Sequence, residues 1–457
     1  MGAAQLLVGV AGADITPDRP LQLEGYGGRE QPATGVLDRL EARAAVFEDG
    51  ATRAALLALD LIGVTADSTG RIRAAVERGC GIPAGNVVVT YSHTHGGPAM
   101  TRYVGSSADA DYVGWVEEAA AAAVVTASRR LRGAAIGVGE GSVELGVNRR
   151  RRTPDGVVLG PSPHGLVDRR VRVLRIDQAD APVPSGTLGR RFLPQADPIA
   201  LLFSCVCHPT ALRAENRRYS GDYPGAARRF VEGSYGASGT LALFLPGCFG
   251  NVRPDLRDGQ GRFRSATPHE MTVLGRWLGS EVIRVAERVV AEPASMVAVG
   301  RRAVRLPYAN VPDAAELRAA LGSPRAGWAE ALLARLERDG GLPEAETTEV
   351  QVLRLGRHWI VALPGETTLE IGRAIESAFY DLGLVGETDA VLTVGYANDY
   401  VCYLCTASHY AEGGYEPTSW PEYLRCGPFV PRVESILLEG ATGAAELAAR
   451  TERAARR

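Results

Sequence analysis

The sequence predicts an α/β fold in which mixed β-sheets are flanked by helices. Strand-like apolar runs alternate with helical patterns from one end of the chain to the other, which is typical of this class. No internal repeat and no shift in composition divides the 457 residues, so we expect one domain over residues 1–457. Several apolar runs end in polar loops that contain glycine and proline, and such loops often carry function.

Periodicity and turn residues place the elements in order. Strands are expected at residues 8–16, 43–47, 53–61, 87–90, 134–147, 171–176, 199–207, 241–245, 297–306, 348–355, 358–363 and 390–396. Helices are expected at residues 68–78, 112–131, up to 232, 272–291, twice within 313–338, from 368, and at 431–453. Two hairpins are expected, over residues 43–61 and 348–363, and residues 153–164 are expected to form a loop.

Composition excludes several classes of function. All 50 basic residues are arginine, so no lysine can form a Schiff base, anchor pyridoxal phosphate or serve a phosphate-binding loop. The net charge of −3 favours neither nucleic acid nor an anionic membrane as a partner. Seven scattered cysteines do not form a disulfide framework. We see no signal peptide and no apolar run of about 20 residues, so we expect a cytoplasmic protein whose partner is a small-molecule substrate.

The first chemical motif is YSHTHGGP at residues 91–98, directly after a buried strand. In extended backbone, residues two apart face the same side. His93 and His95 are therefore expected to project together at a strand end, where open sheets bind ligands. Two imidazoles there indicate a metal site. The alternative is one hydrogen-bonded core histidine and one surface histidine.

Other strand ends add further candidates. The strand at residues 199–207 leads into His208, the one at 358–363 leads into Glu366, and the last leads towards Tyr400 and Tyr403. Two histidines and one carboxylate form a usual ligand set for catalytic zinc. Such an ion polarises a carbonyl and lowers the pKa of bound water to about 7.

At this point the chain resembles the neutral/alkaline (non-lysosomal) ceramidases, which are zinc-dependent amidases. The matching motifs run through almost the whole chain: ADITP at 13–17, SHTHGGP at 92–98, NR at 148–149, CHPT at 207–210, SGDYPG at 220–225, GCFGNVRP at 247–254, LPGETT at 363–368, NDYVCYLCT at 398–406 and YE at 415–416. The resemblance implies the fold of the ceramidase catalytic domain. Because little chain follows the last motif, we expect no C-terminal immunoglobulin-like domain.

The resemblance also implies roles for individual residues. It makes four residues the ligands of one zinc ion per chain: His93, His208, Glu366 and Tyr403. His95 and Arg149 match groups that hold the substrate carbonyl or oxyanion near the metal. Tyr415 matches a second active-site tyrosine.

One loop departs from the family pattern. Ceramidases carry a sequence like SNxGDVxPN, whose serine is taken as the nucleophile, but here Gly247 occupies the serine position and Asn251 the aspartate position. We therefore expect zinc-activated water to attack, with Cys248 as a weaker candidate. Gly247, Cys248 and Asn251 are expected to shape the substrate pocket, and a small, polar substrate is expected in place of ceramide.

Several neighbouring residues allow two interpretations. Asp60 and Asp222 could orient a ligand histidine or could form turns and caps. Of the run Arg149–Arg152, only Arg149 is expected to be functional, and the other three are expected to face solvent. Cys402 and Cys405 are not expected to form a redox pair or a structural zinc site, and Cys205 and Cys207 are expected to pack in the core.

We therefore expect a zinc-dependent hydrolase that cleaves an amide bond. A first alternative keeps the metal but acts on a lactone, lactam or ester, or runs a condensation as a biosynthetic cyclase or acyl transferase. A second alternative is a degenerate, non-catalytic binding protein. The sequence leaves the substrate and the oligomeric state open.

Overall fold

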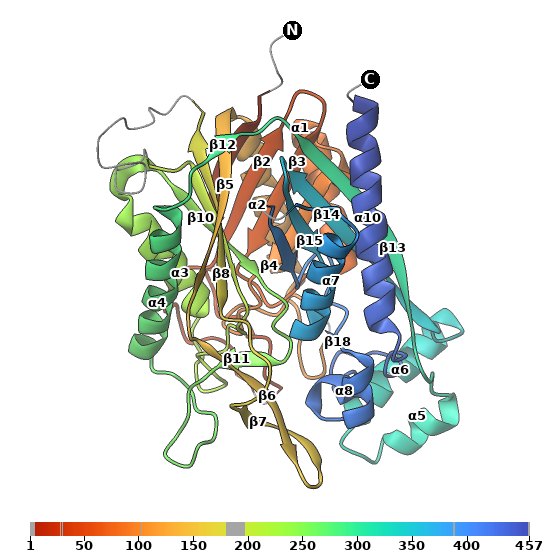
Figure 1. Cartoon of the computed structure of the whole chain (residues 1–457). Coiled ribbons are helices and arrows are strands. Elements are labelled where there is room, and N and C mark those ends of the chain that lie inside the picture. The colour runs from red at the N-terminus through yellow and green to blue at the C-terminus, as the bar shows by residue number, and fades with distance from the viewer. Residues whose placement is uncertain are drawn as a thin grey trace.

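The computed structural model describes residues 5–27, 29, 31–101, 103–179, 197–386 and 389–455. Figure 1 shows four layers: helices, a large sheet, a smaller sheet and further helices. This confirms the predicted mixed α/β class. The two sheets face each other across a closely packed layer that includes Phe47, Leu174, Leu353 and Leu392, all 1% exposed or less.

The large sheet has the strand order β10-β9-β8-β5-β1-β2-β3-β4, with β12 paired to β5. Its strands are β1 (Leu7–Asp14), β2 (Glu41–Glu48), β3 (Arg53–Leu59), β4 (Val87–Tyr91), β5 (Arg132–Ser142), β8 (Arg170–Gln178), β9 (Ala200–Cys205), β10 (Leu241–Pro246) and β12 (Glu292–Pro293). The pairs β3–β4 and β9–β10 are parallel.

The other described strands form three smaller sheets. The four-stranded sheet has the order β13 (Val297–Pro307), β14 (Ala345–Leu355), β15 (His358–Ala362) and β17 (Val391–Val394). A three-stranded sheet joins β11 (Val252–Pro254), β6 (Gly146–Thr153) and β7 (Gly156–Ser162). A parallel pair joins β16 (Glu366–Thr367) to β18 (Tyr403–Leu404).

Helices cover the outer faces of both main sheets. α2 packs on β1 and β2, α4 packs on β5 and β8, and α7 and α10 pack on the smaller sheet. The helices are α1 (Ala66–Cys80), α2 (Ala110–Ser128), α3 (Asp222–Ser234), α4 (Pro268–Ala286), α5 (Ala314–Ala320), α6 (Ala326–Asp339), α7 (Leu369–Asp381), α8 (Ala407–Glu412), α9 (Tyr415–Thr418) and α10 (Val433–Ala455), with short 3₁₀ turns at Ala84–Asn86 and Gly236–Ser238.

The two main sheets bring their strand ends together at one edge. Ala362 of β15 pairs with Val394 of β17 in parallel register, so both strands end at the same level. Gly395, directly after β17, donates its amide N–H to the carbonyl oxygen of Pro246 at the end of β10, at 3.1 Å. The amide of Tyr91, the last residue of β4, likewise bonds to the Tyr396 carbonyl at 3.0 Å. The loops that follow these strands therefore meet.

Most predicted elements are confirmed, including both hairpins. Two predictions are wrong. Residues 134–147 are not one strand, because β5 ends at Ser142 and β6 begins at Gly146, and the expected loop at 153–164 contains β7. The expected exposure of Arg150, in the arginine run within β6, is also wrong. Arg150 is 7% exposed and forms an ion pair with Glu416, whereas Arg151 and Arg152 are exposed as expected.

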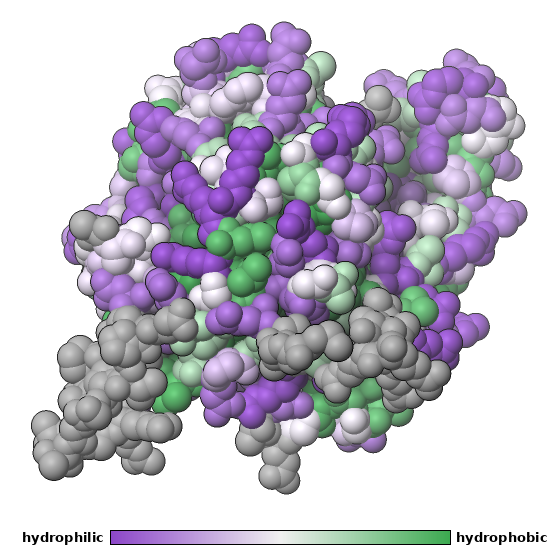
Figure 2. Space-filling model, turned by 90° about the horizontal axis from the view of Figure 1, so that it is seen from above, coloured by the Kyte–Doolittle hydropathy of each residue, from purple (hydrophilic) through white to green (hydrophobic). Residues whose placement is uncertain are grey.

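Figure 2 shows the end of the molecule that lies uppermost in Figure 1. Hydrophilic side chains cover most of the described part of this face, and hydrophobic ones form small patches between them. Among the described helices, none has the length and apolar character needed to cross a bilayer.

Candidate active site

His93 is held by the backbone just after β4. The chain leaves the strand at Ser92, and His93 adopts a left-handed conformation with φ of 62°, which is uncommon outside glycine. Its Nδ1 lies 2.7 Å from the Ile62 carbonyl oxygen. A carbonyl oxygen only accepts hydrogen bonds, so Nδ1 carries the proton and Nε2 faces the other way. His93 is fully buried.

His95 lies beside His93, although the backbone at His93 is not extended as the sequence predicted. The left-handed residue breaks the alternation, and the two rings still meet edge-on with centroids 4.9 Å apart and Nε2 atoms 3.3 Å apart. The predicted neighbourhood is therefore confirmed, while the predicted backbone geometry is wrong. Gly25, with φ of 102°, leaves room for this ring, since an added β-carbon would overlap His95 Nδ1.

His208 is oriented in the same way from the other end of the large sheet. It follows β9 after a three-residue step, and its Nδ1 lies 3.2 Å from the Phe249 carbonyl oxygen in the loop after β10. Its amide donates to the Val252 carbonyl at 3.0 Å. Backbone carbonyls on His93 and His208 supply the outer hydrogen bond that ligating histidines usually make.

Glu366 lies in β16, directly after β15 of the smaller sheet. Gly365, with φ of 61°, turns the chain after β15, and Glu366 then pairs in parallel register with Tyr403. Its Oε1 accepts hydrogen bonds from the hydroxyls of Tyr400, at 3.1 Å, and Tyr423. Its Oε2 remains free to face the histidines. The carboxylate is 1% exposed.

These side chains converge on one point. Glu366 Oε2 lies 3.3 Å from His93 Nε2 and 3.5 Å from His208 Nε2. Ligand atoms of His93, His95 and His208 all lie within 4.8 Å of one another. Glu366 Oε2 and His208 Nε2 are buried without a hydrogen-bond partner. Buried polar atoms rarely remain so, and a divalent cation is the group that would satisfy lone pairs arranged in this way.

Electrostatics favour forms of His208, His95 and Glu366 that could coordinate a metal. Burial lowers the pKa of His208 well below its usual value, and the charges of His93 and Arg149 add to this effect. Burial and His93 act likewise on the pKa of His95. Burial alone would raise the pKa of Glu366, but His93 and hydrogen bonds outweigh it, so this pKa is lowered. Neutral imidazoles and an ionised carboxylate are the ligating forms.

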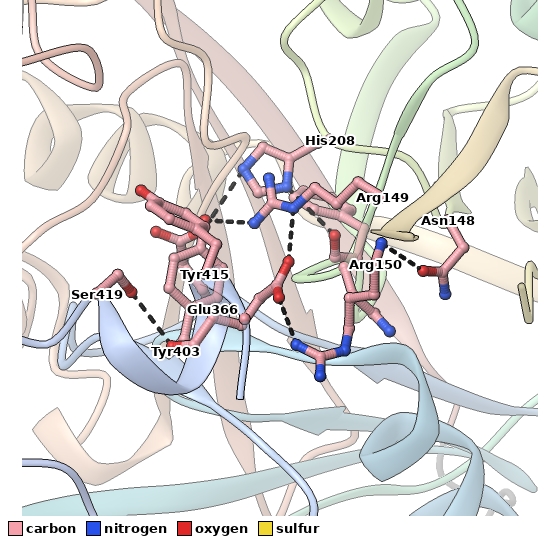
Figure 3. Close-up of polar contacts among 12 residues, drawn as sticks. Asn148, Arg149, Arg150, His208, Glu366, Tyr403, Tyr415 and Ser419 are labelled. Carbon is pink, nitrogen blue, oxygen red and sulfur yellow. Dashed lines mark hydrogen bonds and ion pairs between the residues drawn. The ribbon is translucent and has the colours of Figure 1, made fainter. Parts of the chain in front are cut away.

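A second group of polar side chains lies against this cluster (Figure 3). Arg149 Nη2 donates to the Tyr403 hydroxyl at 2.7 Å, and Arg149 Nε donates to Glu416 at 2.9 Å. The Tyr403 and Tyr415 rings meet edge-on at 5.6 Å, and the Arg149 guanidinium lies over both. Glu416 also binds Arg150 at 2.7 Å. The predicted residues Arg149, Tyr403 and Tyr415 thus lie together, next to His208.

The loop after β10 divides its residues between two locations. Asn251 Nδ2 donates to Glu370, and its Oδ1 accepts from the Leu369 amide at 3.0 Å, so Asn251 fixes the start of α7 just after Glu366. Gly247 and Cys248 line a small cavity with residues of β8 and α7, and no member of the histidine cluster lines it. Burial raises the pKa of Cys248 to about 12, which makes this thiol a poor nucleophile at neutral pH.

Asp60 and Asp222 do not orient either histidine. Asp60 pairs with Arg228 and accepts from the Glu41 amide at 3.0 Å. Asp222 accepts from three backbone amides near the start of α3. The backbone carbonyls described above take the orienting role. The turn and cap interpretation is confirmed for Asp222, whereas Asp60 forms a buried ion pair that neither interpretation predicted. Cys402 and Cys405 are buried, and both are free thiols as expected.

Two polar residues of the site escaped the sequence interpretation. Tyr423 binds Glu366 from a loop that has no strand-end signal. Glu416 was noted only as part of a motif, yet it joins Arg149 to Arg150. The one available signal was the dense group of aromatic and acidic residues at 415–423.

Comparison with known structures defines the class of fold. The chain is similar to the crystal structure of neutral ceramidase from Pseudomonas aeruginosa, with a TM-score of 0.73 and 20% identity over 98% of this chain and 75% of that one. It is equally similar to a ceramidase complexed with C2, with a TM-score of 0.74 and 19% identity over 98% and 76% of the two chains. The protein therefore has the neutral ceramidase fold.

Sequence comparison confirms the resemblance. Residues 6–154 match the profile of the N-terminal part of the neutral/alkaline non-lysosomal ceramidases. The neutral ceramidase of Oryza sativa subsp. japonica is 27% identical over 248 residues, which cover 51% of this chain and 29% of that protein. The neutral ceramidase of Mycobacterium tuberculosis is 38% identical over 72 residues, 16% of this chain and 11% of that protein. The aligned regions thus span less than a third of these relatives' lengths.

Proposed function

We propose that this protein is a metal-dependent hydrolase that cleaves an amide (N-acyl) bond, with zinc as the metal. The observation that carries the proposal is the convergence of His93, His208 and Glu366, two of which present buried atoms without partners. We propose these three as ligands and Tyr403 as the fourth. A zinc ion held there would polarise the substrate carbonyl and make water nucleophilic at neutral pH.

The chain's own groups support hydrolysis around that point. His95 is neutral and its Nε2 lies next to the proposed ligands, so it can accept or donate a proton at the reacting atoms. Arg149 is fixed by Glu416 and supplies positive charge for a developing oxyanion. Tyr415 packs on Tyr403, and its hydroxyl donates a hydrogen bond to Glu422 at 2.9 Å. Burial of these groups strengthens each interaction.

We propose metal-activated water as the nucleophile. Gly247 stands where the family pattern has serine, and the pKa of Cys248 at about 12 leaves its thiol protonated. The same departure keeps a second candidate function open, in which the metal site acts on lactones, lactams or esters or runs a condensation. Assays of matched N-acyl amines, lactams and lactones separate the two.

The direct test is metal content and zinc affinity. Purified protein is expected to bind one zinc ion per chain, measured by elemental analysis and by calorimetry after removal of metal with a chelator. Glu366→Gln removes the negative charge at Oε2 and is expected to weaken zinc binding by about 100-fold or more. Glu370→Gln is the matched control, because this partly buried carboxylate lies four residues on and contacts Asn251 and His409 instead. Wild-type protein that binds no zinc, or equal affinity in the two variants, would refute the proposal.

A further inference from the structure

Arg253 is a buried guanidinium that forms no ion pair with any acidic residue in the described part of the chain. It belongs to β11 and is 6% exposed. Among the described residues its contacts are one hydrogen bond, from Nη2 to the Thr210 carbonyl oxygen at 3.3 Å, and the ring of Phe263, 4.5 Å from Cζ. Its Nε is buried without a hydrogen-bond partner. Burial lowers the pKa of Arg253 to about 10, so the side chain still carries a positive charge at neutral pH.

Neighbouring groups on the same side of the site also lack partners. The Tyr26 hydroxyl, His95 Nδ1 and Arg213 Nε are all buried and unbonded. The Tyr26 and His95 rings are 4.7 Å apart, and the charge of Arg253 acts on the pKa values of both. Three of these groups, the Tyr26 hydroxyl, Arg213 Nε and Arg253 Nε, are hydrogen-bond donors without an acceptor among the described residues, and Tyr26 lies against His95 beside the proposed metal ligands.

Nearby acidic groups do not supply the missing acceptors. Both oxygens of Asp222 are engaged with the backbone amides of Ala211, Leu212 and Tyr223. Arg29, the other buried arginine here, is satisfied by carbonyl oxygens, including those of Arg213 at 2.9 Å and His95. Arg253 differs from Arg29 because its Nε has nothing to bind.

We propose that Arg253 and Tyr26 bind a carboxylate group of the substrate, so that the substrate class is an N-acyl amino acid or a similar anionic amide. This inference rests on the proposed function. A buried, unpaired cation is costly unless it acquires a counter-charge. The planar fork of arginine matches a carboxylate, and a tyrosine hydroxyl adds a third donor.

Arg253 is a residue of this chain that the family pattern does not specify. The loop pattern SNxGDVxPN leaves the position of Arg253 open, so the resemblance assigns it no role. The same loop has lost the serine and the aspartate of the pattern. A loop changed at these positions, with an arginine on the buried side of the site, is expected to select a different substrate.

The test compares two substrates that differ only in charge: N-acetylphenylalanine and N-acetylphenylalaninamide. Wild-type protein is expected to cleave the acetyl group from the acid with a kcat/KM about 100-fold higher, the size of a charge-assisted bidentate interaction. Arg253→Met keeps side-chain length and apolar packing and is expected to reduce this preference to a few-fold, mainly through KM. Arg253→Lys keeps the charge without the fork and is expected to lie between. Arg276→Met, at an exposed position of α4, is the control and is expected to leave the preference unchanged.

A binding measurement separates this inference from the proposed function. Calorimetry is expected to show that phenylacetate binds the wild-type protein at least 10-fold more tightly than 2-phenylethanol, and that Arg253→Met loses this difference. If neither amide is cleaved but this pattern holds, the proposed function fails and the carboxylate site stands. If both amides are cleaved equally well and Arg253→Met binds phenylacetate normally, the inference is overturned while the hydrolase proposal stands.

Discussion

Asp222 is expected to make stability depend on pH. Its carboxylate is 2% exposed and accepts from the amides of Ala211 and Leu212, just beyond His208, so it fixes the loop that carries this histidine. Burial raises its pKa from 3.8 to about 6. The unfolded chain therefore releases this proton near pH 3.8, whereas the folded protein keeps it until about pH 6. The contribution of Asp222 to stability is complete below pH 3.8 and is lost as the pH rises to about 6.

The size of this loss follows from the shift. One pKa unit corresponds to about 1.4 kcal/mol, so a shift of roughly two units gives about 3 kcal/mol between about pH 3 and pH 7.5. Asn is the suitable replacement, because position 222 has φ of 52° and Asn tolerates this conformation. Urea unfolding of wild-type protein and Asp222→Asn across this range measures the difference in free energy of unfolding between them. Because other titrating groups cancel in that difference, it is expected to fall by about 3 kcal/mol. A difference that stays constant with pH would refute the reasoning.

Three further substitutions test the packing around the site and the core. Gly25→Ala is expected to displace the His95 ring and lower kcat/KM at least 10-fold, because an added β-carbon would overlap that ring, whereas Gly27→Ala, in open space, is expected to retain full activity in the same assay. Gly300→Ala is expected to lower the free energy of unfolding by about 3 kcal/mol in urea titrations, because its β-carbon would overlap a backbone oxygen of α10. Arg150→Met is expected to cost about 3 kcal/mol in the same titrations, since it breaks a buried ion pair, and an effect as small as that of a surface substitution would contradict this.

The sequence predicted the location of the site better than the contacts within it. His93, His208 and Glu366 each follow an apolar strand by only a few residues, and a short tether to a buried strand limits where a side chain can lie. The parallel pairs β3–β4, β9–β10 and β15–β17 then bring the strand ends to one edge. Local pattern and chain topology were sufficient for this part.

Contacts that depend on tertiary pairing could not be predicted. In the sequence, Arg150 belongs to a run of arginines that predicts an exposed surface. It is buried because β6 pairs with β7 and because Glu416 packs against it. Arg253 had no visible role for the same reason, since its burial depends on distant Phe263 and Thr210. Likewise, carboxylates were natural candidates to orient the histidines, but loop carbonyls with no sequence signature take that role.

The way these side chains are held implies that the site exists before any ligand arrives. The ring of His93 is fixed by the backbone after β3, the ring of His208 by the backbone after β10, and Glu366 by its pairing with Tyr403. None of these restraints needs an ion. The unpaired lone pairs and the unpaired charge of Arg253 therefore destabilise the folded protein while the site is empty. Because binding would relieve this destabilisation, the proposed metal and an anionic substrate are each expected to stabilise the protein.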